Sequence, residues 1–219
     1  MYRSIFVSAT NTGVGKTTLA KQMAKLYNEK GIKTLLAKPI ESGVQQGDLG
    51  DGGLFLEENL HVDENLRMED ISFYRYVLPA SPFVAARFEP HLPPIDFKQI
   101  EKKLKALQER CDLLIVEGVG GLLVPLDEKV KIIDLALTLR SKILLISPSK
   151  LGMINDLLLN QHYLSTHKLD YQITINMPDA RSYYQTSKPY IDYLNSTLKD
   201  PILIFQEQTS LLLDKLLES

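Results

Sequence analysis

The chain has 219 residues, of which 44% are hydrophobic and 24% are charged. A chain of this length buries roughly 70% of the surface of its unfolded form, so it can build a stable core without disulfides or structural metals. The 25 basic and 27 acidic residues give a net charge of −2, which offers no general attraction to nucleic acid or to an anionic membrane. We therefore expect one globular domain over residues 1–219, and the composition excludes a disordered, collagen-like or coiled-coil chain.

The sequence shows no sign of export or of membrane insertion. Its first residues lack a basic segment followed by a long apolar run. No apolar run approaches the roughly 18 residues that span a bilayer. Cys111 is the single cysteine, so no disulfide can form within the chain. We expect a cytoplasmic protein.

Short runs of consecutive apolar residues recur along the chain. Apolar side chains on neighbouring positions are typical of strands that are covered on both faces, as in a parallel sheet. The runs predict strands at residues 5–7, 35–37, 113–116, 143–146 and 173–175.

Segments with helical spacing separate these runs. Leu19, Met23 and Leu26, for example, recur at intervals of three or four positions, which places them on one face of a helix. Such spacing predicts helices at residues 17–30, 96–110, 151–167, 182–198 and 207–217. The alternation predicts an α/β fold, a doubly wound, mostly parallel sheet with helices on both faces, but not the order of its strands.

Two segments interrupt the alternation. Residues 41–53 contain five glycines and residues 78–94 contain five prolines. Glycine and proline in such numbers indicate loops that leave the sheet and return to it. Long loops in a compact domain are often functional.

A phosphate-binding loop follows the first predicted strand. It ends in the sequence Gly-Lys-Thr at Gly15, Lys16 and Thr17, directly before a helical pattern. Gly13 and Gly15 let backbone N–H groups turn toward phosphates, while Lys16 can reach the β- and γ-phosphates and the Thr17 hydroxyl can bind Mg²⁺. A glycine-rich turn into an ordinary helix is the alternative. The order of strand, loop, Lys-Thr and helix favours nucleotide binding on a P-loop NTPase fold.

Acidic residues mark the edge of the sheet where ligands bind. Glu117 follows the apolar run 113–116, and ligands of doubly wound sheets lie outside the carboxyl ends of the strands. A carboxylate there can hold Mg²⁺ directly or through water, and Gly118 allows close approach of a substrate. An exposed acid in a surface turn is the alternative. Asp51 in the glycine-rich segment is a plausible further metal ligand, with Asp48 as its competitor.

A second lysine ends the second predicted strand. Lys38 would lie on the same edge as the phosphate loop, where a fixed cation can stabilise charge that develops during phosphoryl transfer. It could equally hold an anionic intermediate, or be a solvated lysine at a strand end. Ser42 could donate a hydrogen bond to a phosphate or substrate oxygen.

Four motifs together resemble the dethiobiotin synthetase family. They occupy residues 10–17, 38–43, 117–121 and 150–155 in the order that the family has, and the resemblance extends to about residue 177. It implies an enzyme that uses Mg-ATP, 7,8-diaminononanoate and CO₂ and closes the ureido ring in biotin synthesis through a carbamate and a carbamic–phosphoric anhydride. It also implies a homodimer.

The resemblance further implies roles for individual residues. Those implied in catalysis are Lys16, Lys38 and Thr12. Those implied in nucleotide binding are Gly13, Val14, Gly15, Lys16, Thr17, Thr18, Glu117 and Asn176. Those implied in substrate binding are Thr12, Ser42 and Gly118, with Gly152, Met153, Ile154 and Asn155 from the other subunit. The implied Mg²⁺ ligands are Thr17, Asp51 and Glu117.

Two other classes of P-loop protein fit the sequence less well. Nucleotide-switch ATPases of the partition or septum-placement type carry a signature lysine in the loop, where this chain has Asn11. Small-molecule kinases carry an arginine-rich lid, whereas residues 78–94 contain only Arg87. Two differences from the dethiobiotin synthetase pattern concern the adenine pocket: Met177 follows Asn176 where the family often has aspartate, and residues 200–205 lack a Gly-x-Ile-Pro run.

Overall fold

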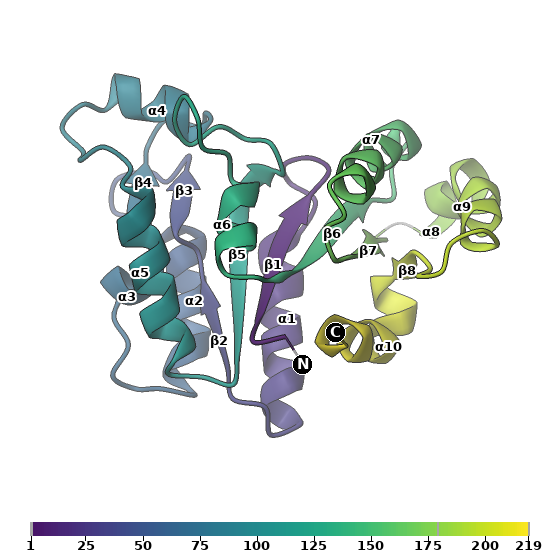
Figure 1. Cartoon of the computed structure of the whole chain (residues 1–219), viewed down its shortest axis with the longest axis horizontal. Helices are drawn as coiled ribbons and strands as arrows, with labels where there is room; N and C mark the ends of the chain where they lie inside the picture. The colour runs from purple at the N-terminus through teal and green to yellow at the C-terminus, as the bar shows by residue number, and fades with distance from the viewer. Residues whose placement is uncertain (1, 179, 219) are drawn as a thin grey trace.

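A six-stranded parallel sheet forms the centre of the computed structural model, which describes residues 2–178 and 180–218 (Figure 1). The strand order is β2-β5-β1-β6-β7-β8, and every neighbouring pair is parallel. Its strands are β1 (Ser4–Ala9), β2 (Thr34–Ala37), β5 (Leu113–Gly121), β6 (Lys142–Pro148), β7 (Tyr171–Asn176) and β8 (Leu203–Ile204). The predicted doubly wound parallel sheet is confirmed.

Helices cover both faces of the sheet (Figure 1). On one face α1 (Lys16–Glu29) packs with α10 (Phe205–Leu217), and the Tyr27 hydroxyl donates a hydrogen bond of 2.7 Å to the Leu213 carbonyl. The opposite face carries α5 (Phe97–Gln108), α6 (Ile133–Thr138) and α7 (Met153–Thr166). Both faces of the sheet are therefore shielded from water, which is why all six residues of β1 are buried. No helix in the described ranges is long and apolar enough to cross a membrane.

The two segments expected to be loops contain regular structure, so that expectation is partly wrong. In the first, β3 (Ile40–Ser42) pairs with β4 (Tyr74–Tyr76), and α2 (Gly50–Leu60) begins among the glycines. In the second, α4 (Pro82–Phe88) begins at a proline, with Ser81 as its N-cap residue. Proline suits the first turn of a helix because no hydrogen bond from its nitrogen is needed there.

The helix predicted at residues 182–198 is two helices. They are α8 (Ala180–Thr186) and α9 (Lys188–Asn195), and Pro189 lies in the first turn of the second. Proline cannot donate the backbone hydrogen bond that would continue a helix through this point, so the helix is interrupted at Ser187. A further short helix, α3 (Met68–Ile71), precedes β4 and was not predicted.

A buried asparagine completes the edge of the sheet at β2. The Asn59 side chain, on α2, donates a hydrogen bond of 2.8 Å to the Leu36 carbonyl and accepts one of 2.8 Å from the Leu36 N–H. Within the described part of the chain β2 has no neighbouring strand on this side, so Asn59 takes the place of one. The same two bonds fix α2 against the strand that leads to Lys38.

We predict that Asn59→Ala lowers the free energy of unfolding by about 2–4 kcal/mol, because both backbone groups of Leu36 lose their partner in a buried place. Urea denaturation followed by far-UV circular dichroism measures this loss. Glu57→Ala, at an exposed position on the same helix, is the control and should change stability by less than about 0.5 kcal/mol. Equal stability of the two variants would contradict this account of the edge.

Candidate active site

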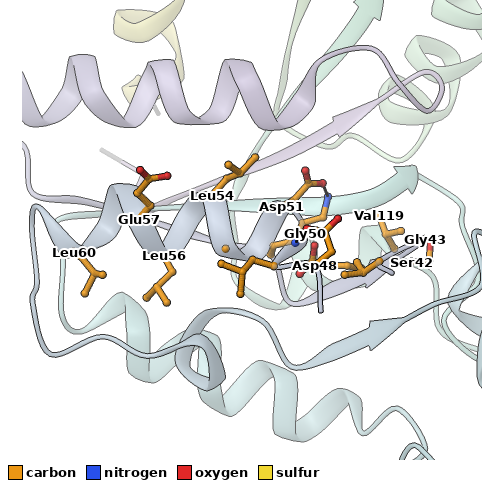
Figure 2. Close-up of a pocket in the computed structure, with 15 residues that line it drawn as sticks. Ser42, Gly43, Asp48, Gly50, Asp51, Leu54, Leu56, Glu57, Leu60 and Val119 are labelled. Carbon is orange, nitrogen blue, oxygen red and sulfur yellow. Dashed lines mark hydrogen bonds and ion pairs between the residues drawn. The ribbon is translucent and has the colours of Figure 1, made fainter. Parts of the chain in front are cut away.

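The candidate site lies where the carboxyl ends of neighbouring parallel strands meet. β2 and β5 pair with Ala37 opposite Val116, so the next residues, Lys38 and Glu117, lie side by side. Two adjoining cavities of about 870 and 760 Å³ open here, and Lys38 lines both. Figure 2 shows the smaller cavity, with Asp51 at the start of α2 on its edge. This is the edge that the sequence predicted for a ligand.

The phosphate loop forms one wall of the larger cavity. Gly13 and Gly15 have φ values of +67° and +91°, a region that favours glycine, and Gly15 is the N-cap of α1. Gly15 has no side chain to cap the helix, which leaves the free N–H groups of its first turn for an anion. Seven predicted residues line this wall: Thr12, Gly13, Val14, Gly15, Lys16, Thr17 and Thr18.

A buried ammonium group joins three elements at the centre of the site. The Lys38 Nζ forms an ion pair with Glu117 Oε1 and lies 3.2 Å from Asp51 Oδ2. Lys38 and Glu117 are only 4% and 1% exposed, so their charges are withdrawn from water. The Thr17 hydroxyl donates a hydrogen bond of 3.2 Å to Glu117 Oε1, which links the group to α1. Lys38 also donates to the Gly118 carbonyl over 3.4 Å.

The two lysines of the site have opposite pKa shifts. Burial lowers the pKa of Lys16, and the positive charge of Lys38 lowers it further. Burial alone would also lower the pKa of Lys38, but the carboxylates of Glu117 and Asp51 outweigh it and raise that pKa. Lys38 is therefore a fixed cation at neutral pH. Lys16 is a cation whose charge an anionic ligand beside it would stabilise.

The oxygen atoms around Lys38 suit a magnesium ion. Glu117 Oε2 is buried and makes no hydrogen bond within the described chain, while Asp51 and the Thr17 hydroxyl lie close by. Carboxylate and hydroxyl oxygens are hard ligands of the kind that Mg²⁺ prefers. The described residues include no metal-binding group of three or more His, Cys, Asp or Glu. Phosphate oxygens and water would have to complete the coordination, as is common for Mg²⁺.

The two aspartates that the sequence left as alternatives make different contacts, and the choice of metal ligand stays a prediction. Asp48 Oδ1 accepts a hydrogen bond of 3.0 Å from the Gly50 N–H and thereby shapes the approach to α2. Asp51, the residue after Gly50, is the aspartate that contacts Lys38. Ser42 lines both cavities, and its contact with substrate stays a prediction.

Four predicted substrate-binding residues lie apart from this group. Gly152 caps α7 with φ of +92°, Met153 is buried, and the exposed Asn155 donates to Asp156 over 3.3 Å. Neither cavity is lined by any residue of the set Gly152, Met153, Ile154 and Asn155. Within one chain the structure therefore does not bring them together with Lys16. Their contact with substrate stays a prediction.

Asn176, predicted to bind nucleotide, forms a hydrogen bond with the phosphate loop. Its Nδ2 donates a hydrogen bond of 2.7 Å to the Val14 carbonyl, and its Oδ1 accepts one of 2.6 Å from Gln206 Nε2. Sequence reasoning missed Gln206. The one signal for it was its position just after the last strand of the sheet, but that two-residue strand was itself not predicted.

Comparisons with known proteins identify relatives over nearly the whole chain. A family model described as an AAA domain matches residues 3–186. The ATP-dependent dethiobiotin synthetase BioD of Helicobacter pylori strain Shi470 is 44% identical over 93% of this chain and 94% of its own. The protein of that name from Wolinella succinogenes is 37% identical over 86% and 88%.

Solved structures with a similar fold are more distant. A plasmid partition protein of Borrelia burgdorferi has a TM-score of 0.57 at 16% identity, covering 98% of this chain and 96% of its own. The MinC:MinD cell division protein complex of Aquifex aeolicus has a TM-score of 0.52 at 19% identity, covering 97% and 85%. Similarity at this level shows the fold alone.

We predict that alanine is tolerated less well at Gly15 than at Gly13. A Cβ at Gly15 would lie 2.5 Å from Asn176 Nδ2, whereas one at Gly13 would have no atom within 4 Å among the described residues other than its chain neighbours. Gly13→Ala should lower the free energy of unfolding by about 1 kcal/mol, through backbone strain alone. Gly15→Ala should lower it by at least about 1 kcal/mol more. Urea unfolding without ligand measures both. Equal losses would contradict the packing of Asn176 against the loop.

Proposed function

The chain belongs to the family of ATP-dependent dethiobiotin synthetases, and from this premise we propose which of its residues carry each step. The enzyme is a ligase of biotin synthesis that consumes ATP. The residue assignment rests on one observation. Lys16, Lys38 and Glu117 line the same cavity beside the phosphate loop. Two cations and a carboxylate beside a phosphate loop suit a phosphoryl transfer that needs positioning and charge stabilisation.

The reaction implied by the family has three steps. One amine of 7,8-diaminononanoate attacks CO₂ and forms a carbamate. A carbamate oxygen then attacks the γ-phosphorus of ATP, so that ADP leaves and a carbamic–phosphoric anhydride forms. The second amine attacks the anhydride carbon, the bond from that carbon to the phosphate oxygen breaks, and the ureido ring closes. No covalent enzyme intermediate is required.

The two lysines take different parts in this sequence. Lys16, in the first turn of α1, would bridge the phosphates and the carbamate. Lys38, at the end of β2, would bind the carbamate and the oxygens of the transferring phosphoryl group. The raised pKa of Lys38 supports this assignment, because the group keeps its charge as the anionic intermediates form.

Thr17, Asp51 and Glu117 would hold Mg²⁺. When bound, the ion would neutralise charge on the β- and γ-phosphates. The unpartnered Glu117 Oε2 and the nearby Thr17 hydroxyl support this set. Lys38 contacts both carboxylates and so holds them near each other.

The remaining assignments concern the diamine and the subunits. Thr12, Ser42 and Gly118 would contact the reacting end of the diamine. Thr12 and Ser42 line the larger cavity, and the Gly118 carbonyl accepts a hydrogen bond from Lys38. We place the carboxylate tail at the start of α7 of a second subunit in a homodimer. Leu151 and Leu159 support an interface here, because these apolar side chains are 81% and 63% exposed in the single chain.

Isotope incorporation tests the overall reaction. The protein is incubated with 7,8-diaminononanoate, Mg-ATP and ¹³C-labelled bicarbonate, and the products are analysed by mass spectrometry. We expect dethiobiotin that carries the label in its ureido carbon. Formation of ADP without labelled dethiobiotin would refute the proposal.

Alanine at each lysine should separate their roles. We predict that Lys16→Ala lowers kcat by at least about a hundredfold, which corresponds to roughly 3 kcal/mol of transition-state stabilisation. Lys38→Ala should lower kcat strongly while the Kd for ATP changes less than about threefold, because its charge acts on the carbamate and the transferring group. Steady-state kinetics and calorimetric binding measure both. A Lys38→Ala enzyme with normal kcat and weaker ATP binding would contradict the assignment.

A mixing experiment tests the shared site. Lys16→Ala and Asn155→Ala are each expected to reduce activity, the second by raising the KM for the diamine by about tenfold or more. If sites are shared, a mixed dimer has one site with both defects and one site with neither. Activity at low diamine should therefore return when the two variants exchange subunits. No recovery after proven exchange would place Asn155 outside its partner's site.

A further inference from the structure

We infer that the ion pair between the buried Glu41 and the half-buried Arg75 positions Asp51. Neither residue belongs to the set proposed to touch substrate or metal. They lie opposite each other on β3 and β4, the two strands that pair outside the central sheet. Arg75 Nε is 3.4 Å from Glu41 Oε1, and the Ser72 hydroxyl donates a hydrogen bond of 2.9 Å to the same oxygen.

The burial of Glu41 indicates that its charge has a specific use. The residue is 2% exposed, and a carboxylate taken out of water is costly unless other groups stabilise it. A neutral side chain of similar shape at this position between β3 and β4 would avoid the cost of removing a charge from water.

The first turn of α2 packs directly on this carboxylate. A Cβ on Gly50 would lie 2.5 Å from Glu41 Oε2, and one on Gly52 would lie 2.6 Å from Glu41 Oε1. Only residues without a side chain allow the helix to come so close. A negative charge at the start of a helix is stabilised by the helix dipole, so Glu41 attracts the turn that carries Asp51.

Arg75 holds the segment that leads into this turn. Its Nη2 donates a hydrogen bond of 2.6 Å to the Asp48 carbonyl, and Asp48 Oδ1 in turn accepts from the Gly50 N–H. Figure 2 shows Asp48, Gly50 and Asp51 close together at the start of α2, on the rim of the cavity. Glu41 and Arg75 therefore fix the backbone on both sides of Gly50, one residue before Asp51.

A fixed backbone beside Asp51 matters because Mg²⁺ requires its ligands to be placed accurately. Mg²⁺ accepts little departure from octahedral geometry. Mutation of groups that orient metal ligands commonly lowers metal affinity by 10- to 100-fold. The Asp51 side chain is 40% exposed and has its ion pair with Lys38 on one side only, so its position also depends on where the first turn of α2 lies. The inference rests on the proposed role of Asp51 as a ligand of Mg²⁺.

Metal dependence in Glu41→Gln tests the inference, because glutamine keeps the shape and removes the charge. Two quantities are measured against Mg²⁺ concentration: binding of a non-hydrolysable ATP analogue by calorimetry, and dethiobiotin formation. We expect the Mg²⁺ concentration at half-saturation to rise about tenfold in both, with the KM for the diamine unchanged. Arg75→Lys should give a change in the same direction.

Asp63→Asn is the matched control. It breaks the ion pair in which Arg110 Nη2 lies 2.7 Å from Asp63 Oδ2, just beyond the other end of α2. A general loosening of the helix would change metal dependence in this variant as well. We expect it to leave the half-saturating Mg²⁺ concentration unchanged, and an equal rise in the control would overturn the inference.

A double-mutant cycle separates this inference from the assignment beneath it. If Glu41 acts through Asp51, Glu41→Gln should add less than about a twofold change once Asp51→Asn is present. Independent tenfold effects of the two changes, or no effect of Glu41→Gln alone, would overturn the role of Glu41. No effect of Asp51→Asn alone would instead refute Asp51 as a metal ligand, and the inference with it.

Discussion

The burial of one ammonium group, that of Lys38, between the carboxylates of Glu117 and Asp51 is the constraint on which the site depends. Removing such charges from water costs several kcal/mol unless they are paired closely. The pairing needs β2 beside β5 with Ala37 opposite Val116, and it needs α2 held against β2. Sheet order, strand register and the contacts of one helix are therefore all required to keep this lysine charged beside the phosphate loop.

The sequence predicted what local pattern can show. The strand at 113–116, the phosphate loop and the acid at Glu117 all follow from short-range order, and the structure has them where expected. It could not show that β2 and β5 are neighbours. Residues 38–112, 75 residues in all, lie between Ala37 at the end of β2 and Leu113 at the start of β5, and pairing at such range depends on tertiary packing. The start of α2 was hidden because its glycines, which let it pack on Glu41, are also typical of a loop.

Fold and chemistry are separable in this molecule. A plasmid partition protein and a cell division protein complex have a similar fold at TM-scores of 0.57 and 0.52, with identities of 16% and 19%. Their likeness shows the fold and carries no information on the reaction. In the assignment proposed above, the reaction depends on the residues at the strand ends, here Lys38 and Glu117.

The coupling of ATP consumption to the diamine tests the central claim most directly. Phosphate release is measured with Mg-ATP alone and after addition of 7,8-diaminononanoate and bicarbonate together, while dethiobiotin is quantified in the same samples. The account predicts slow release with ATP alone, a rise of at least about tenfold when both substrates are present, and equal amounts of phosphate and dethiobiotin. Phosphate release that does not respond to the diamine would contradict it and would favour a nucleotide switch.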